Sequence, residues 1–273
     1  MPQIDITALA NILRDASRQE SLPRFRRLDA SMVHTKTEAI DLVTEADVAT
    51  EEVIKARIAE WMPDALFVGE ESVAADPALL DRLATAELAV VVDPIDGTAN
   101  YAAGLPLYAC MAAVVSGGET VAGIIYDPMG DDWVMAEKGG GAWLRRPNGE
   151  AVRLHVGADL PLPEMVGMAS VAYMPKAVRA QVLQNTDKVR LVSNFRCAGH
   201  EYRTFASGHA QFMAYNKLMP WDHLAGTLIS QEAGGYAARL DGQPYLPSHV
   251  DGGLLVAINR DSWDVLRREV FTF

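Results

Sequence analysis

The first sixty residues alternate apolar and polar positions with the period of an α-helix. The pattern predicts a helix over roughly residues 4–20 and a second over roughly 46–61. One face of the second segment carries four residues at helical spacing: Asp47, Ile54, Ile58 and Trp61. An acid near a helix N-terminus is locally favourable, but an acid on an apolar face also needs a hydrogen-bond partner. We therefore expect Asp47 to be buried in the first helical turn and paired with a hydroxyl or a metal-bound water.

Short apolar runs follow, bounded by Gly, Pro and Asp, and they have the length of strands. In the first half these predicted strands are Leu66–Val68, Ala89–Val92, Met111–Val115, Val121–Tyr126, Trp133–Glu137 and Gly141–Leu144. Glycine-rich and Asp-Pro turns separate the later ones, which is typical of an antiparallel meander. Residues 139–141 are all glycine, but the lysine and the following helix of a phosphate loop are missing, so a hairpin turn is favoured.

From about residue 150 strand-like and helical segments alternate. The predicted strands are Met165–Ala169, Val189–Val192, Gln211–Ala214 and Leu254–Ala257, and the predicted helices are 177–185, 200–207, 222–233 and 260–270. This alternation predicts a layered α/β half. We expect an α/β protein with an α+β subdomain at 1–147 and an α/β subdomain at 148–273. A cleft between two such units is a usual place for a ligand site.

Composition and charge narrow the classes of partner. The chain has 273 residues with 24 basic and 36 acidic side chains, a net charge of −12. This balance argues against a nucleic-acid surface, which needs clustered Lys and Arg, but not against a phosphate ligand, because bound cations invert the local field. Cys110 and Cys197 lack C-x-x-C spacing, so we expect buried thiols in a reduced, cytoplasmic protein. Neither a signal-peptide pattern nor a membrane-spanning apolar run is present in the sequence.

The most informative chemistry lies where an apolar run, Leu88 to Val92, meets the segment Asp93-Pro94-Ile95-Asp96-Gly97-Thr98. Two carboxylates this close repel each other unless a cation or a shared proton compensates. Mg²⁺ takes oxygen ligands and often keeps a substrate phosphate in its shell, and a glycine lets a phosphate approach the backbone. The alternative is a pair of turns, since Asp-Pro and Asp-Gly both form turns readily.

Two further acidic motifs favour the metal interpretation. Gly69-Glu70-Glu71-Ser72 follows the apolar run at Leu66–Val68, and Trp221-Asp222-His223 opens a helical run that stops at Gly234-Gly235. Taken alone, the glutamates would be a solvated turn and Asp222 would be an N-cap. Three acidic motifs that can meet at one site make a cation site the better interpretation.

Together these motifs resemble the signatures of the inositol monophosphatase family, which are Mg²⁺-dependent, lithium-sensitive phosphomonoesterases. The matching segments occur in order across nearly the whole chain: Asp41–Asp47, Gly69–Ser72, Asp93–Tyr101 and Trp221–Gly235. The resemblance implies a layered αβαβα architecture, a homodimer and two or three Mg²⁺ ions. It also implies that the substrate is a small phosphorylated metabolite.

The resemblance also implies a ligand for each metal. Glu70, Asp93 and the backbone carbonyl of Ile95 would hold the first ion. Asp93, Asp96 and Asp222 would hold the second, with Asp93 bridging the two. Two ions a few ångström apart can bind a phosphate ester, activate a water and stabilise the leaving oxygen.

Further roles follow from the same resemblance. Glu70 and Thr98 would position and deprotonate the water, with Asp47 accepting from the Thr98 hydroxyl, and the amides of Gly97 and Thr98 would bind the phosphate. Lys36 is a candidate phosphate neighbour, although a solvated lysine is an equally good interpretation. Glu71 could lie behind the ligands or simply face solvent.

The second half departs from the inositol-selective pattern, which has a Gly-Ser/Thr-Ala-Ala segment and an acid just before the Trp-Asp motif. Here the alcohol half of the substrate is expected to meet Gly199, His200, Glu201 and Asn216, together with Asp96 and Asp222. Glu201 or His200 could recognise an amine, as in histidinol phosphate, or could serve only the helix surface. His223 and the other histidines have no metal-ligand spacing and are interpreted as structural.

The sequence therefore predicts a phosphomonoesterase acting on a small polyol or amino-alcohol phosphate. Histidinol phosphate, fructose 1,6-bisphosphate and nucleotide 3′-phosphates remain alternative substrates. A regulatory, RNA-associated binding protein of the same fold is the alternative of another class. The complete acidic set favours catalysis over binding alone.

Overall fold

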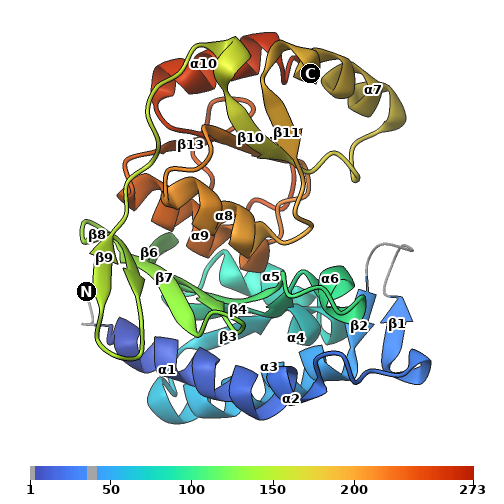
Figure 1. The fold of residues 1–273 in the computed structure, drawn as a ribbon. Coiled ribbons are helices and arrows are strands. Elements are labelled where there is room, and N and C mark those ends of the chain that lie inside the picture. The colour runs from blue at the N-terminus through green and yellow to red at the C-terminus, as the bar shows by residue number, and fades with distance from the viewer. Residues whose placement is uncertain (1–3, 36–41) are drawn as a thin grey trace.

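The computed structural model describes residues 4–35 and 42–273, and it has five layers of helices and sheets (Figure 1). The predicted αβαβα layering is confirmed. Helices α1 (Ile6–Ala16) and α3 (Glu45–Trp61) cover one face of the first sheet. Helices α8 (Ala198–Ala206) and α9 (Pro220–Glu232) lie between the two sheets, and α7 (Lys176–Asn185) and α10 (Arg260–Glu269) lie beyond the second sheet.

The first sheet has seven strands in sequence order. They are β3 (Leu66–Gly69), β4 (Leu88–Asp96), β5 (Ala109–Ser116), β6 (Glu119–Asp127), β7 (Asp132–Glu137), β8 (Gly141–Arg145) and β9 (Ala151–Arg153). Only the β3–β4 pair is parallel, and the rest form the predicted antiparallel meander. Because β9 pairs with β8, this sheet continues past the expected boundary at residue 147.

The second sheet has the strand order β11-β10-β12-β14-β13. Its strands are β10 (Val166–Ala169), β11 (Leu191–Ser193), β12 (Phe212–Tyr215), β13 (Tyr236–Arg239) and β14 (Leu254–Ala257). Strands β10, β11 and β12 run parallel to one another, and β14 runs antiparallel to both of its neighbours. The carboxyl ends of the three parallel strands therefore share one edge of the sheet.

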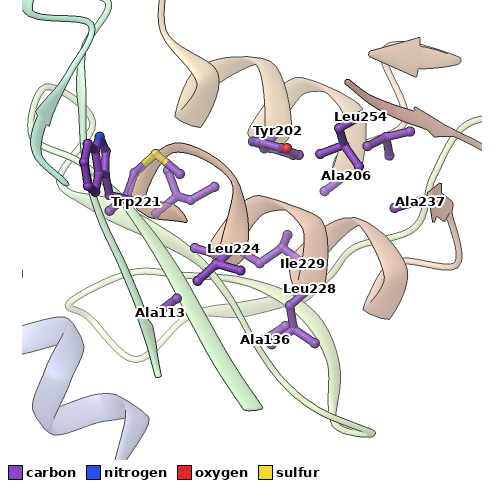
Figure 2. Packing of buried hydrophobic residues seen from close by; sticks show 14 of the residues in the cluster. Ala113, Ala136, Tyr202, Ala206, Trp221, Leu224, Leu228, Ile229, Ala237 and Leu254 are labelled. Carbon is purple, nitrogen blue, oxygen red and sulfur yellow. The ribbon is translucent and has the colours of Figure 1, made fainter. Parts of the chain in front are cut away.

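The helices between the sheets join the two halves into one core (Figure 2). Helix α9 is buried on nearly all sides, so its apolar residues do not form a single stripe. Gly226 permits the close approach of α8, because a Cβ there would lie 2.1 Å from the ring of Tyr202. Gly123 of β6 does the same for α9, since its Cβ would meet the backbone of Ala225 at 2.8 Å. A shared core of this kind holds the elements of both halves in fixed positions.

The smaller elements were not predicted. They are α2 (Leu22–Arg24), α4 (Glu70–Ala75), α5 (Ala78–Leu83), α6 (Thr98–Ala102), β1 (Val33–Thr35), β2 (Leu42–Thr44), the strands β9 and β13, and short 3₁₀ turns at 30–32, 162–164 and 186–188. The first helix ends at Ala16 and continues as a π-helical turn over Ser17–Ser21, in place of one helix over 4–20. Within the described ranges, no helix has the length and hydropathy needed to cross a membrane.

Candidate active site

Strand β4 brings Asp93 and Asp96 to the centre of the molecule. The sequence interpretation ended this strand at Val92, but it runs on to Asp96 and stays paired with β5. The register shifts between Asp93 and Asp96, where Pro94 lies, because a bulge accommodates a residue with no N–H. The Asp93 Oδ1 atom accepts a hydrogen bond of 3.0 Å from the Ile95 amide, which fixes the carboxylate inside the bulge.

Asp222 comes to the same place from the first turn of α9. It is the third residue of the helix, after Pro220, so the alternative of a simple N-cap is wrong, since Met219 occupies that position. One carboxylate oxygen from each of Asp93, Asp96 and Asp222 lies within 4.8 Å of the others. The structure therefore brings together three of the predicted metal ligands from two separate elements.

Glu70 is the first residue of α4, immediately after the end of β3. The helix N-terminus is held by Glu51 of α3, whose carboxylate accepts 2.7 Å hydrogen bonds from the amides of Glu71 and Ser72. Gly69 is required here, because a Cβ would lie 2.3 Å from the Glu51 carboxyl carbon. Sequence reasoning missed Glu51, although it lies four residues after Asp47 and so on the same helical face.

The predicted contact between Asp47 and Thr98 is present. Asp47 is fully buried, and its Oδ1 atom lies 3.1 Å from the Thr98 hydroxyl, which also lies 3.0 Å from the carbonyl of Ile95. The Asp47 Oδ2 atom accepts from the amide and the hydroxyl of Thr44 at 2.9 and 2.6 Å in a capping box. Asp47 therefore starts α3 and orients Thr98 at the same time.

Asp96 connects the acidic cluster to the second half of the chain. Its carboxylate accepts from the amides of Ala198 and Gly199 at the start of α8. The Cys197 thiol lies 3.0 Å from Asp96 Oδ2, and burial raises the pKa of this thiol well above its usual value. Both cysteines are buried free thiols, as expected.

Burial raises the pKa of Asp93, Asp96 and Asp222, and repulsion from neighbouring carboxylates adds to the rise for Asp93 and Asp222. For Asp93 the main cause is burial, followed by the charges of Glu70, Asp96 and Asp222. For Asp222 the main cause is again burial, and the charge of Lys217 opposes the rise in pKa. Burial also raises the pKa of Asp96, against the hydrogen bonds from Cys197 and Gly199, and it raises that of Asp47 to about 7. Several buried carboxylates become stable together only when a cation compensates them. An all-oxygen donor set of this kind fits a hard divalent ion such as Mg²⁺.

These pKa shifts predict how the metal-free protein responds to pH. A carboxyl whose pKa is raised in the folded state stabilises the fold fully at pH values below its unfolded pKa, near 3.8. This stabilisation is lost as the pH rises through the folded-state pKa, which is about 7 for Asp47. With EDTA present, the Tm should therefore fall between pH 5 and pH 8, and Mg²⁺ should reverse most of that fall. Thermal unfolding at fixed ionic strength measures both effects. A Tm in EDTA that is flat or rises over this range would contradict the electrostatic description of the cluster.

The acidic cluster forms one side of a cavity of about 720 Å³. Glu70, Asp93, Asp96, Thr98 and Asp222 lie on that side. Most of the remaining lining residues come from the second half of the chain, chiefly from the ends of β10, β11 and β12, with Arg179 from α7. Residues from both halves of the chain therefore line the cavity that holds the acidic cluster.

The residues predicted to meet the alcohol half of the substrate are only partly in the cavity. Asp96, Gly97, Thr98, Glu201 and Asp222 line it, but Gly199, His200 and Asn216 do not. His200 Nε2 lies 3.1 Å from the carbonyl of Tyr108, and the Asn216 side-chain amide donates to the carbonyl of Tyr173 at 3.3 Å. The side chains of His200 and Asn216 thus contact backbone carbonyls and do not line the cavity, and their contact with the substrate stays a prediction. Gly199 acts through its amide on Asp96.

Glu201 lines the cavity, but both oxygens of its carboxylate accept hydrogen bonds from other residues of the protein. One oxygen accepts from the Phe195 amide at 2.8 Å and the other from the Tyr215 hydroxyl at 2.7 Å. Burial raises the pKa of Glu201 to about 7. His223 is structural, as expected, with its Nε2 atom 2.9 Å from the carbonyl of Lys217.

Other functional side chains were missed. Asn100 is buried and donates from its amide nitrogen to the carbonyls of Leu107 and Phe195, at 2.9 and 2.7 Å, so it ties α6 to the second half. Three cations, Arg179, Arg196 and Lys217, line the same cavity. No motif marks them in the sequence, because they come from three separate connections. Lys36 lies outside the described residues.

Comparisons with known proteins agree with this geometry. A sequence model of the inositol monophosphatase family matches residues 5–266. An inositol-1-monophosphatase of Caulobacter vibrioides is 32% identical over 83% of this chain and 86% of its own length. A histidinol-phosphatase of Streptomyces coelicolor is 33% identical over 88% and 89%. The crystal structure of the extragenic suppressor protein suhB of Bartonella henselae has a TM-score of 0.82 at 26% identity and covers 98% of both chains. The chain belongs to the inositol monophosphatase family and is a phosphatase.

Proposed function

We propose that the protein is a Mg²⁺-dependent phosphomonoesterase of small polyol or amino-alcohol phosphates. The observation that carries this proposal is the meeting of Asp93, Asp96 and Asp222 within 4.8 Å at the base of a large cavity. A phosphate ester repels nucleophiles through its own charge, and Mg²⁺ bound here would neutralise that charge and acidify a water. Membership of the family supports the same activity.

The residues of the chain take distinct parts in this proposal. Glu70, Asp93 and the carbonyl of Ile95 would hold one ion, and Asp93, Asp96 and Asp222 a second. Asp96 is already aimed by its hydrogen bonds from the start of α8, so it needs little reorganisation to act as a ligand. Glu71 lines no part of the cavity that the structure describes, and we assign it no role in the reaction.

Thr98 and Glu70 would orient the attacking water. The Thr98 hydroxyl has acceptors on two sides, Asp47 and the carbonyl of Ile95, so its proton points toward the protein. Its lone pairs can then accept a hydrogen bond from a water in the cavity, which orients that water. The amides of Gly97 and Thr98 would bind the phosphate, at a position where Gly97 has a φ of 89° and no side chain obstructs.

The proposal is tested by phosphate release from inositol 1-phosphate, glycerol 2-phosphate, histidinol phosphate, fructose 1,6-bisphosphate and adenosine 3′,5′-bisphosphate. We expect release that requires Mg²⁺, stops with EDTA and is inhibited by millimolar lithium, as in the family. Relatives include proteins named inositol-1-monophosphatase, histidinol-phosphatase and fructose-1,6-bisphosphatase/inositol-1-monophosphatase, so the panel covers their substrates. A folded protein that releases no phosphate from any of them would favour the alternative of a regulatory binding protein.

We also propose a cytoplasmic homodimer, on the resemblance to the family. The two buried free thiols are compatible with a reducing compartment. Sedimentation velocity would test the dimer directly, and a monomer at micromolar concentration would contradict it.

A further inference from the structure

His223 follows Asp222 in the first turn of α9, and both nitrogens of its ring are engaged by the protein. The Nε2 atom lies 2.9 Å from the carbonyl oxygen of Lys217, and the Nδ1 atom lies 3.1 Å from the hydroxyl oxygen of Tyr202. The residue is only 2% exposed, although it belongs to the lining of the cavity. Because neither nitrogen is free to meet a substrate, His223 can influence the reaction only through its partners.

These partners fix the tautomer of the ring. Burial lowers the pKa of His223 to about 4, so the ring is neutral and carries a single N–H group. A carbonyl oxygen can only accept a hydrogen bond, so the N–H group is on Nε2 and donates to Lys217. Nδ1 is then an acceptor, and the Tyr202 hydroxyl donates to it. The ring of Tyr215, with its centre 4.5 Å from that of the imidazole, limits rotation further.

Tyr202 joins His223 to the helix that holds Asp96. It belongs to α8 (Figure 2) and comes three residues after Gly199, whose amide donates to the Asp96 carboxylate. Residues three apart in a helix lie on the same face. The bond between Tyr202 and His223 therefore fixes the start of α8 relative to the start of α9. It fixes the carboxylate of Asp96 relative to that of Asp222 in the same way.

Lys217 joins His223 to the connection between β12 and α9. The hydrogen bond from Nε2 holds the backbone of Lys217, while the ammonium group lies 5.0 Å from the centre of the Tyr173 ring. Burial raises the pKa of Asp222, and the charge of Lys217 opposes that rise. His223 thus fixes the backbone of a residue whose charge acts on its own neighbour, Asp222.

We infer that His223 is a positioning residue for the cation that Asp96 and Asp222 would share. Its two hydrogen bonds keep these carboxylates at the spacing at which one oxygen of each, together with one of Asp93, lies within 4.8 Å of the others. Groups that orient metal ligands from behind usually contribute a factor of about 10 to 100 in metal affinity or activity. The inference rests on the proposed function, because that proposal supplies the cation.

Three variants test the inference through Mg²⁺ binding without substrate, measured by isothermal titration calorimetry. His223→Leu removes both hydrogen bonds and should weaken Mg²⁺ binding by about 10-fold or more. Tyr202→Phe removes only the bond to Nδ1 and should weaken binding by a smaller factor. His223→Gln keeps a side-chain amide that can donate to the Lys217 carbonyl, so it should recover part of the affinity. In phosphate-release assays the Mg²⁺ concentration for half-maximal activity should rise in the same order.

Tyr126→Phe is the matched control for Tyr202→Phe. Tyr126 is fully buried, and its hydroxyl donates to Asp131 at 2.9 Å, but it does not line the cavity. Each variant loses one hydrogen bond of a buried tyrosine, so each should lower the Tm. Only Tyr202→Phe should also change Mg²⁺ binding, because a purely structural contribution would lower the Tm and leave the affinity unchanged.

The outcomes separate this inference from the proposed function. Wild-type Mg²⁺ affinity in both His223→Leu and Tyr202→Phe would overturn the positioning role and leave the phosphatase intact. If His223→Leu does not fold, wild-type affinity in Tyr202→Phe and His223→Gln would overturn it equally. A His223→Gln variant as weak as His223→Leu would overturn the part given to the bond with Lys217. A wild-type protein that binds no Mg²⁺ would overturn the proposed function and this inference with it.

Discussion

Asp93→Asn is expected to lower phosphate release by about 10³-fold or more while the protein stays folded, because a bridging metal ligand contributes several kcal/mol. Asp93 is buried beside Asp96 and Asp222, and the proposal gives it a place between both ions. Asparagine keeps the shape and the acceptor for the Ile95 amide but removes the charge. Steady-state assays across a Mg²⁺ titration measure the loss, and activity near wild type would refute the two-metal assignment.

The same substitution should change stability in the opposite direction. Burial and the neighbouring acids raise the pKa of Asp93, so the ionised carboxylate destabilises the metal-free fold. In EDTA at pH 8, Asp93→Asn should therefore have a higher Tm than wild type. Adding Mg²⁺ should raise the Tm of the variant less than it raises that of wild type. Asp131→Asn is the control, because Arg14 holds the pKa of Asp131 down to about 2. That variant should lose Tm and keep activity, since Asp131 does not line the cavity.

Much of the site could be predicted because its residues follow strong local patterns. The apolar run before Asp93 predicted a strand, and the helical stripe through Ile54 and Ile58 placed Asp47 on a buried face, where its partner is Thr98. What the local pattern could not show was the bulge. Proline and aspartate after Val92 look like a turn, yet pairing with β5 keeps the chain in the sheet as far as Asp96.

The substrate side was harder to predict because it depends on tertiary structure. Tyr215 and Lys217 line the cavity while Asn216 between them does not, as expected where an extended chain alternates its side chains. The predicted position, Asn216, is therefore one residue away from each of the two side chains that line the cavity. Arg179 and Arg196 carry no motif, and only the parallel arrangement of β10 and β11 brings their connections together. Helices α4 and α5 have six residues each, too few for a helical period to be recognised.

The link between Asp96 and α8 couples the two halves at the site. One carboxylate both belongs to the acidic cluster and accepts from the first amides of a helix in the second half. Glu201 of the same helix holds the loop that carries Arg196. The position of α8 therefore sets the Asp96 carboxylate and the loop of Arg196 together, so a shift of this helix would disturb both at once.

Thr98→Ala is expected to lower kcat by about 10²-fold, the usual size of a general acid–base contribution. The hydroxyl lies 3.1 Å from Asp47 Oδ1 and 3.0 Å from the carbonyl of Ile95, and a single proton serves both acceptors. Thr98 lines the cavity, where a water would donate a hydrogen bond to the hydroxyl oxygen. Removing the hydroxyl takes away that acceptor and leaves every carboxylate of the cluster in place. The Mg²⁺ concentration for half-maximal activity should therefore change little.

Thr98→Ser is the matched variant, because it keeps the hydroxyl and should retain most of kcat. Thr98 follows Gly97 at the start of α6, and that helix has no side-chain cap to lose, so both variants should unfold close to the wild-type Tm. Single-turnover assays at saturating Mg²⁺ separate the chemical step from metal binding. A large shift in Mg²⁺ dependence with kcat unchanged would mean that Thr98 supports the metals and does not orient the water.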